Sequence, residues 1–198
     1  MNVNVAQIYG NWDLGYSLDK HMLSSKFLGN DEWGNPRFEN TRTEAGEAIY
    51  QLKYQNDFTK CASIAQSIAD EIIPKLPPIS FIIAMPPSKA RAKQPVPEIT
   101  CELAGIIGLP FISNFLIKTQ VTQQMKDIEK RSDKIAALQQ SIQINEAVMR
   151  ENLPLTSYNV LIIDDLYDTG TSLEVATDIL RKCDKIAKIF VATATRKG

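Results

Sequence analysis

The sequence is poor in several features that would assign a protein class directly. It has only three cysteines, Cys61, Cys101 and Cys183, and none lies in a CxxC pair. An odd number of separated cysteines argues against a zinc ribbon or a disulfide framework. We therefore expect no zinc, and we predict free, mostly buried thiols in a reducing cytoplasm.

Long apolar runs and an excess of one charge are also missing. No run of roughly 18 apolar residues occurs, so no transmembrane helix is predicted and no membrane partner is expected. Met1 to Gly10 has neither the basic start nor the apolar core of a signal peptide. The formal net charge of −1 argues against chain-wide attraction to nucleic acid, although a local basic patch stays open.

The composition that is present fits one domain with a small addition. The chain has 198 residues, 44% of them hydrophobic, which is enough for a sizeable core. Residues 1–40 hold both tryptophans, Trp12 and Trp33, and the only histidine, His21. Their glycines indicate turns, short strands or hairpins. We predict an irregular or β-rich N-terminal appendage or hood over 1–40 and the main domain over 41–198.

Beyond residue 40, helical patterns alternate with short apolar runs. Helices are expected from near Thr41, where Thr41 and Glu44 have capping-box spacing, and then at 58–73, 97–108 and 171–183. Strands are expected at 81–85, 111–117, 141–144, 160–163 and 186–195. This order is typical of an α/β fold whose mainly parallel sheet is covered by helices on both faces.

The segment 160–173, VLIIDDLYDTGTSL, carries the most chemistry. Asp164 and Asp165 follow an aliphatic strand, where open α/β sheets place ligands. The loop that follows can bind phosphate: Gly170 permits close backbone approach, helix N-terminal amides attract anions, and hydroxyls donate from Thr169, Thr171 and Ser172. Carboxylates repel phosphate, so the two acids suit sugar hydroxyls or a hydrated Mg²⁺.

This segment resembles the motif that binds 5-phosphoribosyl 1-pyrophosphate (PRPP) in type I phosphoribosyltransferases. The resemblance implies that Asp164 and Asp165 hold the ribose 2- and 3-hydroxyls and that Asp168 to Ser172 cradle the 5-phosphate. Around Asp168 the segment resembles the hypoxanthine-guanine enzymes, in which an acid at this place can act as general base. Asp168 is therefore either a base or a loop residue turned to solvent.

A second basic loop follows the strand at 81–85. It contains Pro87, Ser88, Lys89, Arg91 and Lys93. Arginine grips phosphate oxygens with two donors and lysine acts as a point charge. The loop is thus either a pyrophosphate site, with Lys89 and Arg91 stabilising the leaving group, or a plain exposed loop.

Residues 42–196 also resemble the competence protein ComF family, through Leu52-Lys53-Tyr54, the Pro-rich loop and the final Ala192 to Arg196. This chain lacks that family's N-terminal zinc-binding cysteines, and Lys93 to Val96 replace its usual Gly-Phe-Asn-Gln. Residues 118–134 match the place of the flexible catalytic loop. They form either a basic lid or a solvated helical face of mixed charge.

The resemblance implies displacement at C1 of PRPP by a nucleobase or amine acceptor, with Mg²⁺ and release of pyrophosphate. A cytoplasmic enzyme of nucleotide metabolism is the first hypothesis, and a homodimer is a family-level expectation. A non-catalytic PRPP- or nucleotide-binding regulator, ComF-like and acting in DNA uptake or a DNA-related pathway, is the second, and a direct role in handling single-stranded DNA is the third. His21, Trp12 and Trp33 are either part of an acceptor pocket or packing residues.

Overall fold

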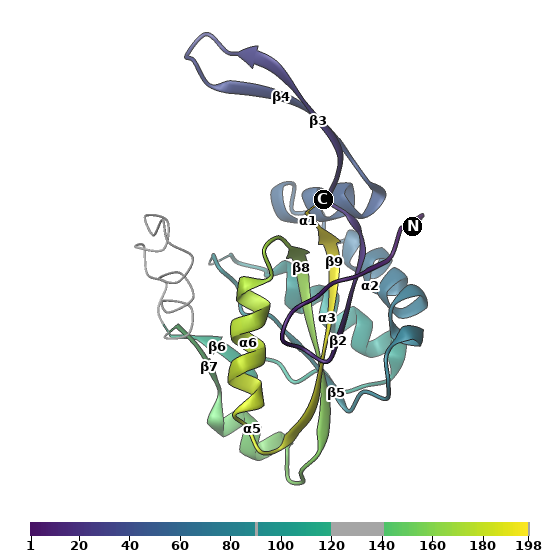
Figure 1. Cartoon of the computed structure of the whole chain (residues 1–198), viewed down its shortest axis with the longest axis vertical. Coiled ribbons are helices and arrows are strands. Elements are labelled where there is room, and N and C mark those ends of the chain that lie inside the picture. Colours follow the sequence, from purple (N-terminus) through teal and green to yellow (C-terminus); the bar gives the residue numbers. More distant parts are fainter. Residues whose placement is uncertain (90, 120–140, 198) are drawn as a thin grey trace.

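A five-stranded sheet forms the centre of the chain. Figure 1 shows the computed structural model, which describes residues 1–89, 91–119 and 141–197. The strands lie in the order β1-β2-β9-β8-β5. β1 is antiparallel to β2, and the other neighbours are parallel. The strand bounds are β1 Ala6–Gln7, β2 Leu14–Lys20, β5 Phe81–Ala84, β8 Tyr158–Tyr167 and β9 Ile186–Arg196.

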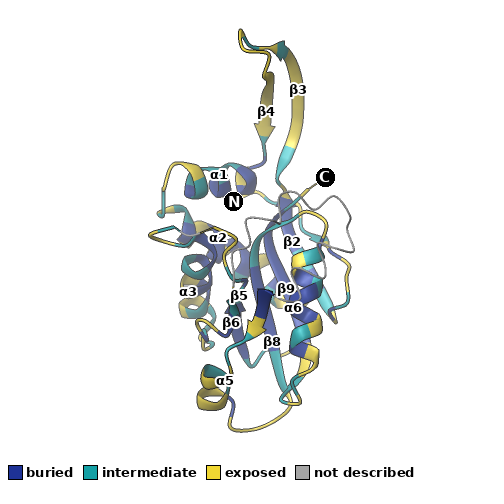
Figure 2. Cartoon of the chain, turned by 90° about the vertical axis from the view of Figure 1, so that its left-hand side faces the viewer, coloured by how far each residue is buried: buried dark blue, intermediate teal, exposed yellow. Residues whose placement is uncertain are grey.

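Helices cover both faces of this sheet (Figure 2). One face carries α1 (Glu44–Tyr54), α2 (Lys60–Glu71) and α3 (Pro95–Ile107), and the other carries α6 (Thr171–Arg181). The alternation of β8 explains the two cores, because Val160 and Ile162 enter the core with α6 while Leu161 and Ile163 enter the other. The predicted α/β class with a mainly parallel sheet is confirmed.

Several helix boundaries follow from local chemistry. The side chain of Thr43, not Thr41, caps α1 by accepting a hydrogen bond from the amide of Gly46, because Thr41 belongs to β4. α2 is followed by a short 3-10 helix, η1 (Ile73–Lys75), and α3 ends at Gly108 with φ of 67°. The left-handed conformation of Gly108 explains the stop, since glycine adopts it without steric cost.

The strand predicted at 111–117 is wrong in part. Phe111 makes only an isolated parallel bridge to Ile82, and the chain then turns through Asn114, whose φ is 55°. Only β6 (Leu116–Lys118) is extended, and it pairs antiparallel with β7 (Ile142–Ile144) away from the main sheet. A short helix, α5 (Glu146–Asn152), follows β7. No described helix has the length and apolar character needed to cross a membrane.

The predicted appendage at 1–40 consists of two different parts. β2 is an integral strand of the sheet, paired in parallel with β9, and Leu18 and Trp12 are buried in the cores. Only the hairpin of β3 (Met22–Asn30) and β4 (Pro36–Arg42) projects from the body, beyond α1 in Figure 1. β2 contains Gly15, Ser17 and Asp19, residue types that are common in turns, although all three are buried in the sheet.

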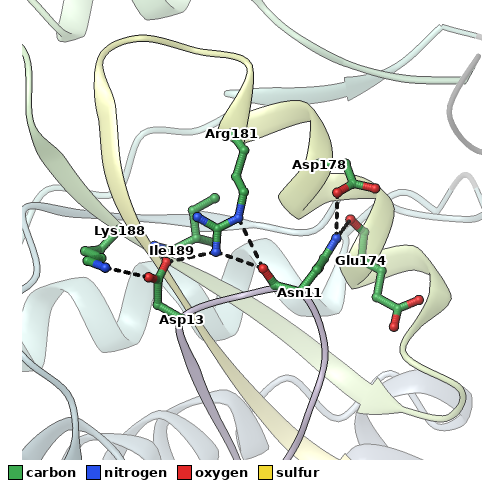
Figure 3. Close-up of polar contacts among 7 residues, drawn as sticks. All are labelled: Asn11, Asp13, Glu174, Asp178, Arg181, Lys188 and Ile189. Atoms are coloured by element: carbon green, nitrogen blue, oxygen red, sulfur yellow. Dashed lines mark hydrogen bonds and ion pairs between the residues drawn. The ribbon is translucent and has the colours of Figure 1, made fainter.

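Polar contacts fasten the loop before β2 to α6 and β9 (Figure 3). Arg181 donates to the carbonyl oxygen of Asn11 and to Asp13, and Asn11 donates to the carbonyl oxygen of Glu174. The carboxylate of Asp13 also accepts from Lys188 at 2.8 Å and from the amide of Ile189. Burial alone would raise the pKa of Asp13, but these hydrogen bonds and nearby positive charges outweigh it and lower the pKa.

The three cysteines are free thiols in different surroundings. Cys61 is buried in α2, Cys183 is half-buried and Cys101 is exposed on α3. The prediction of mostly buried thiols is therefore wrong for Cys101. Burial raises the pKa of Cys61 to about 11, so this thiol is unreactive at neutral pH.

Candidate functional site

Two adjoining cavities lie at the carboxyl ends of β5 and β8. The larger has a volume of about 330 Å³ and the smaller about 80 Å³. Asp164, Leu166 and Ser172 line both of them. The carboxyl edge of a parallel sheet is where α/β proteins bind ligands. Asp164 stands between the two cavities, and Asp165 lines the larger one only.

The smaller cavity is built by the turn from β8 into α6. Gly170, with φ of 77°, immediately precedes the helix, and a Cβ there would lie 2.9 Å from the ring of Tyr167. The hydroxyls of Thr169 and Thr171 are 3.0 Å apart. The first amides of a helix lack intrahelical acceptors and meet the positive end of its dipole. This cavity can therefore hold a phosphate-sized anion.

The two acids at the centre of the site are not equivalent. Neighbouring residues of a strand point to opposite faces of the sheet. Asp165 points to the side of α1, where Lys53 pairs with its carboxylate at 2.8 Å, and its backbone oxygen accepts from Thr195. Asp164 accepts a hydrogen bond from the amide of Asp165 at 2.9 Å. Burial and the charge of Asp165 raise the pKa of Asp164.

Lys118 supplies a second positive charge near the acids. It ends β6 and lines the larger cavity with Asp164 and Asp165. Burial lowers the pKa of Lys118, and the negative charge of Asp164 opposes that shift. The acidic pair thus faces one lysine from α1 and another from β6.

The acidic pair suits Mg²⁺ better than a metal ion whose ligands all come from protein side chains. Within the described ranges, no group of three or more His, Cys, Asp or Glu side chains could enclose a metal ion. Mg²⁺ usually binds through one or two carboxylates, with water and substrate phosphates completing its shell. Asp164 and Asp165 fit that pattern, although Lys53 already contacts one oxygen of Asp165.

The basic loop after β5 lies along the larger cavity. Pro87, Ser88, Lys89 and Arg91 all line it. The side-chain amide of Gln94 donates to the backbone oxygens of Lys89 and Arg91, at 3.0 and 3.5 Å, and so ties the loop to the start of α3. Lys89 and Arg91, two of the three basic residues of this loop, therefore lie at the site.

Lys93, the third basic residue of the loop, does not line the larger cavity. It pairs with Glu98 at 3.0 Å and lies over the ring of Phe58. Its neighbours come from α3 and from the segment before α2, so it fixes the loop from outside the cavity.

Asp168 lines the smaller cavity. Its carboxylate is half exposed and pairs with Lys197 at 3.2 Å. This position leaves the two interpretations of Asp168, a base or a solvent-facing loop residue, both open.

The other candidates of the N-terminal region lie at different depths. Trp12 is buried and meets the ring of Tyr167 edge-on, whereas Trp33 is 82% exposed at the tip of the hairpin. The Nδ1 atom of His21 lies 3.2 Å from the hydroxyl of Thr195, which donates to the backbone of Asp165. Burial, with the charges of Arg42 and Lys53, lowers the pKa of His21.

The predicted lid over 118–134 lies outside the described residues after Thr119.

The sequence did not indicate every residue of the site. Lys53, Tyr54 and Gln94 line the larger cavity, yet none was predicted as a site residue. Lys53 and Tyr54 end a helix far from the motif in sequence, and only the likeness of Leu52-Lys53-Tyr54 to ComF proteins distinguishes them there. Their place in the site depends on tertiary packing.

No protein-family model and no curated protein match the chain. Similar solved structures include adenine phosphoribosyltransferase from Trypanosoma brucei in complex with AMP, pyrophosphate and ribose-5-phosphate (11% identity, 98% of this chain, 74% of that chain, TM-score 0.49). The adenine phosphoribosyltransferase of Saccharomyces cerevisiae is another (14%, 86%, 84%, TM-score 0.41). UMP synthase of Leishmania donovani is a third (15%, 84%, TM-score 0.40), and the chain spans 28% of its length.

Proposed function

We propose that this chain is a phosphoribosyltransferase of type I fold, which binds PRPP and transfers its phosphoribosyl group to a nitrogenous acceptor. The observation that carries the proposal is the pair of adjoining cavities with Asp164 at their shared wall. An anion cradle, two acids and a basic loop follow one another in space. PRPP has the same order of groups: a 5-phosphate, a ribose diol and a pyrophosphate.

In the proposed reaction each group has a separate task. The amides and hydroxyls of 168–172 hold the 5-phosphate, and Asp164 and Asp165 accept hydrogen bonds from the ribose hydroxyls. Lys89 and Arg91 stabilise the pyrophosphate as its bond to C1 breaks and the acceptor nitrogen forms the new bond. Mg²⁺, when bound near Asp164 and Asp165, supplies further positive charge for the pyrophosphate. Asp168 is the candidate to take the acceptor's proton.

A second candidate function is a non-catalytic PRPP or nucleotide sensor of the same fold. The ion pair of Asp168 with Lys197 favours it, because a carboxylate engaged by a surface lysine at 3.2 Å is a poor general base until that pair opens. A ComF-like identity, a homodimer and a cytoplasmic location extend the proposal, and the three free thiols are consistent with a reducing compartment.

One assay separates these functions. The protein is incubated with Mg²⁺, PRPP and a panel of nucleobases, and pyrophosphate release is followed. The enzyme hypothesis predicts release that Asp164→Asn with Asp165→Asn abolishes, while Asp70→Asn, on the exposed surface of α2, leaves it unchanged. Tight PRPP binding without turnover on any base supports the sensor. No binding of PRPP or of any nucleoside monophosphate contradicts both.

A further inference from the structure

The ion pair between Lys53 and Asp165 has no task in the reaction described above. Its nitrogen and oxygen are 2.8 Å apart, and the two side chains are only 21% and 14% exposed. Lys53 belongs to the last turn of α1, whereas Asp165 belongs to β8. Both line the larger cavity. A contact this short between residues so distant in sequence fixes the carboxylate where the ligand would lie.

The main chain of Asp165 is held as well. Its amide donates to Asp164 and its carbonyl oxygen accepts from the hydroxyl of Thr195, each at 2.9 Å. Thr195 is fully buried in β9. Backbone and side chain are therefore both restrained, and Lys53 determines which way one carboxylate oxygen points.

The charges around the acids also require a partner such as Lys53. Asp164 and Asp165 are adjacent, and two carboxylates so close oppose each other's ionisation. Lys53 approaches from α1, and Lys118 lines the same cavity from β6. Two lysines therefore lie at the same edge of the sheet as the two aspartates, and Lys53 is the one that contacts Asp165. Removing one partner of a largely buried pair leaves the other charge uncompensated.

We propose that Lys53 is a positioning residue that determines sugar specificity. Its ammonium group holds one oxygen of Asp165 in place and leaves the other oxygen to accept a hydrogen bond from a ribose hydroxyl. The site then prefers ribose phosphates to 2-deoxyribose phosphates, and Asp165 does not coordinate a divalent cation directly. This inference rests on the proposed binding of a phosphorylated ribose.

The test compares ribose 5-phosphate with 2-deoxyribose 5-phosphate by titration calorimetry without divalent metal. A hydrogen bond to a charged acceptor predicts that the wild type prefers the ribose compound about tenfold or more. In Lys53→Met this preference should fall to about twofold or less. Lys53→Arg should restore most of it. Lys60→Met is the matched control, because Lys60 also pairs with an aspartate, Asp57, but on α2 outside the site.

A second measurement uses Mn²⁺ binding followed by electron paramagnetic resonance. Loss of Lys53 frees an oxygen of Asp165, so Lys53→Met should bind Mn²⁺ several-fold more tightly than the wild type. Asp165→Asn with Lys53→Met removes both partners, and this pair should fold even where the single variant does not. It should show the same sugar preference as Asp165→Asn alone.

The outcomes distinguish the role of Lys53 from the proposed function itself. A wild type that binds neither sugar phosphate nor PRPP contradicts the proposed function. A wild type that prefers ribose, with the preference kept in Lys53→Met, overturns the role of Lys53 and leaves the proposed function intact. A further change of preference when Lys53→Met is added to Asp165→Asn also overturns it, because Lys53 would then act without Asp165.

Discussion

At the scale of single residues, the main feature is the inequality of the two adjacent acids. Asp165 has a lysine at 2.8 Å, whereas Asp164 lies half-buried between the two cavities beside a second negative charge. Burial and Asp165 raise the pKa of Asp164 from its ordinary value of 3.8. An acid kept in such a place makes the fold less stable, which is typical of a residue retained for binding.

This inequality predicts a stabilising substitution. Because the folded protein holds the proton of Asp164 more tightly than the unfolded chain, stability falls as pH rises from 3.8 through the raised pKa. Asp164→Asn removes this loss. We expect its free energy of unfolding to exceed that of the wild type by about 1–3 kcal/mol at pH 8 and by much less at pH 5.

Urea unfolding between pH 5 and 9, without ligand or metal, measures this difference. Asp70→Asn serves as the control, since Asp70 is exposed on α2. An Asp164→Asn protein that is less stable than the wild type at pH 8 would show that Asp164 contributes to the fold.

Gly170 allows a second prediction at the same scale. Its φ is 77°, and a side chain placed there would bring its Cβ within 2.9 Å of Tyr167, so the position has no room for one. Gly170→Ala should lower the free energy of unfolding by about 1–2 kcal/mol and weaken ribose 5-phosphate binding. Gly105→Ala, where a Cβ meets nothing within 4 Å, should instead stabilise α3 by about 0.5–1 kcal/mol. Urea unfolding measures both, and equal effects of the two variants would contradict this account.

At the scale of elements, the β3–β4 hairpin contrasts with the rest of the fold. Leu23, Phe27 and Phe38 on it are 52–66% exposed. Its connection to the body is at the root, where Arg42 pairs with Glu47 and lies over the ring of Tyr50. A two-stranded ribbon with few other contacts adds little to the stability of a domain.

Replacement of residues 24–40 by a short Gly-Ser linker should therefore change the free energy of unfolding by less than about 1 kcal/mol. Ribose 5-phosphate affinity should also stay the same. Thr43→Ala, just after the root, should cost about 1 kcal/mol, because Thr43 caps α1 and donates to the carbonyl oxygen of Lys20 at 2.6 Å. Urea unfolding and calorimetry measure both. A hairpin replacement that costs several kcal/mol would show that the hairpin belongs to the folded body.

The same scale shows how far the sequence could predict this structure. The apolar run 160–163 predicts a buried strand, but β8 continues through Tyr167 because β9 pairs with it residue by residue. A local sequence pattern cannot show that β9 will pair with this segment. The place of β2 in the main sheet could not be predicted for the same reason. Its polar residues are typical of a turn, and they form a strand because β9 pairs with them in parallel. The turn into α6 at Thr169, Gly170 and Thr171 was predictable because glycine and hydroxyl side chains act locally, whereas the Lys53–Asp165 pair depends on the packed fold.

At the scale of the whole molecule, the N-terminal segment links the turn before α6 to the end of that helix. The hydroxyl of Tyr167 donates to the backbone oxygen of Tyr9, and Asp13 joins Arg181 and Lys188. The segment from Tyr9 to Asp13 therefore contacts both Tyr167, before the turn into α6, and Arg181 at the far end of α6.

Asp13 is the residue at which the contribution of these contacts to stability is best tested. Its pKa is lowered in the folded protein, so its contribution to stability is present above 3.8 and is lost as pH falls through the lowered value. Its carboxylate is 18% exposed, but its lysine and arginine partners are 59% and 41% exposed, which screens the pairs. Asp13→Asn should therefore cost only about 1–2 kcal/mol at pH 7, because it removes the negative charge and one of the two oxygens that accept from Arg181, Lys188 and the amide of Ile189.

Urea unfolding at pH 7 and at pH 3 measures the difference in free energy of unfolding between Asp13→Asn and the wild type. This difference should become smaller at pH 3. Asp184→Asn, an exposed aspartate near the end of α6, should match the wild type at both. Because the N-terminal segment also supports Tyr167, Asp13→Asn should weaken ribose 5-phosphate binding slightly, by about threefold or less. A destabilised variant with a much larger loss of binding would mean that the segment itself contacts the ligand.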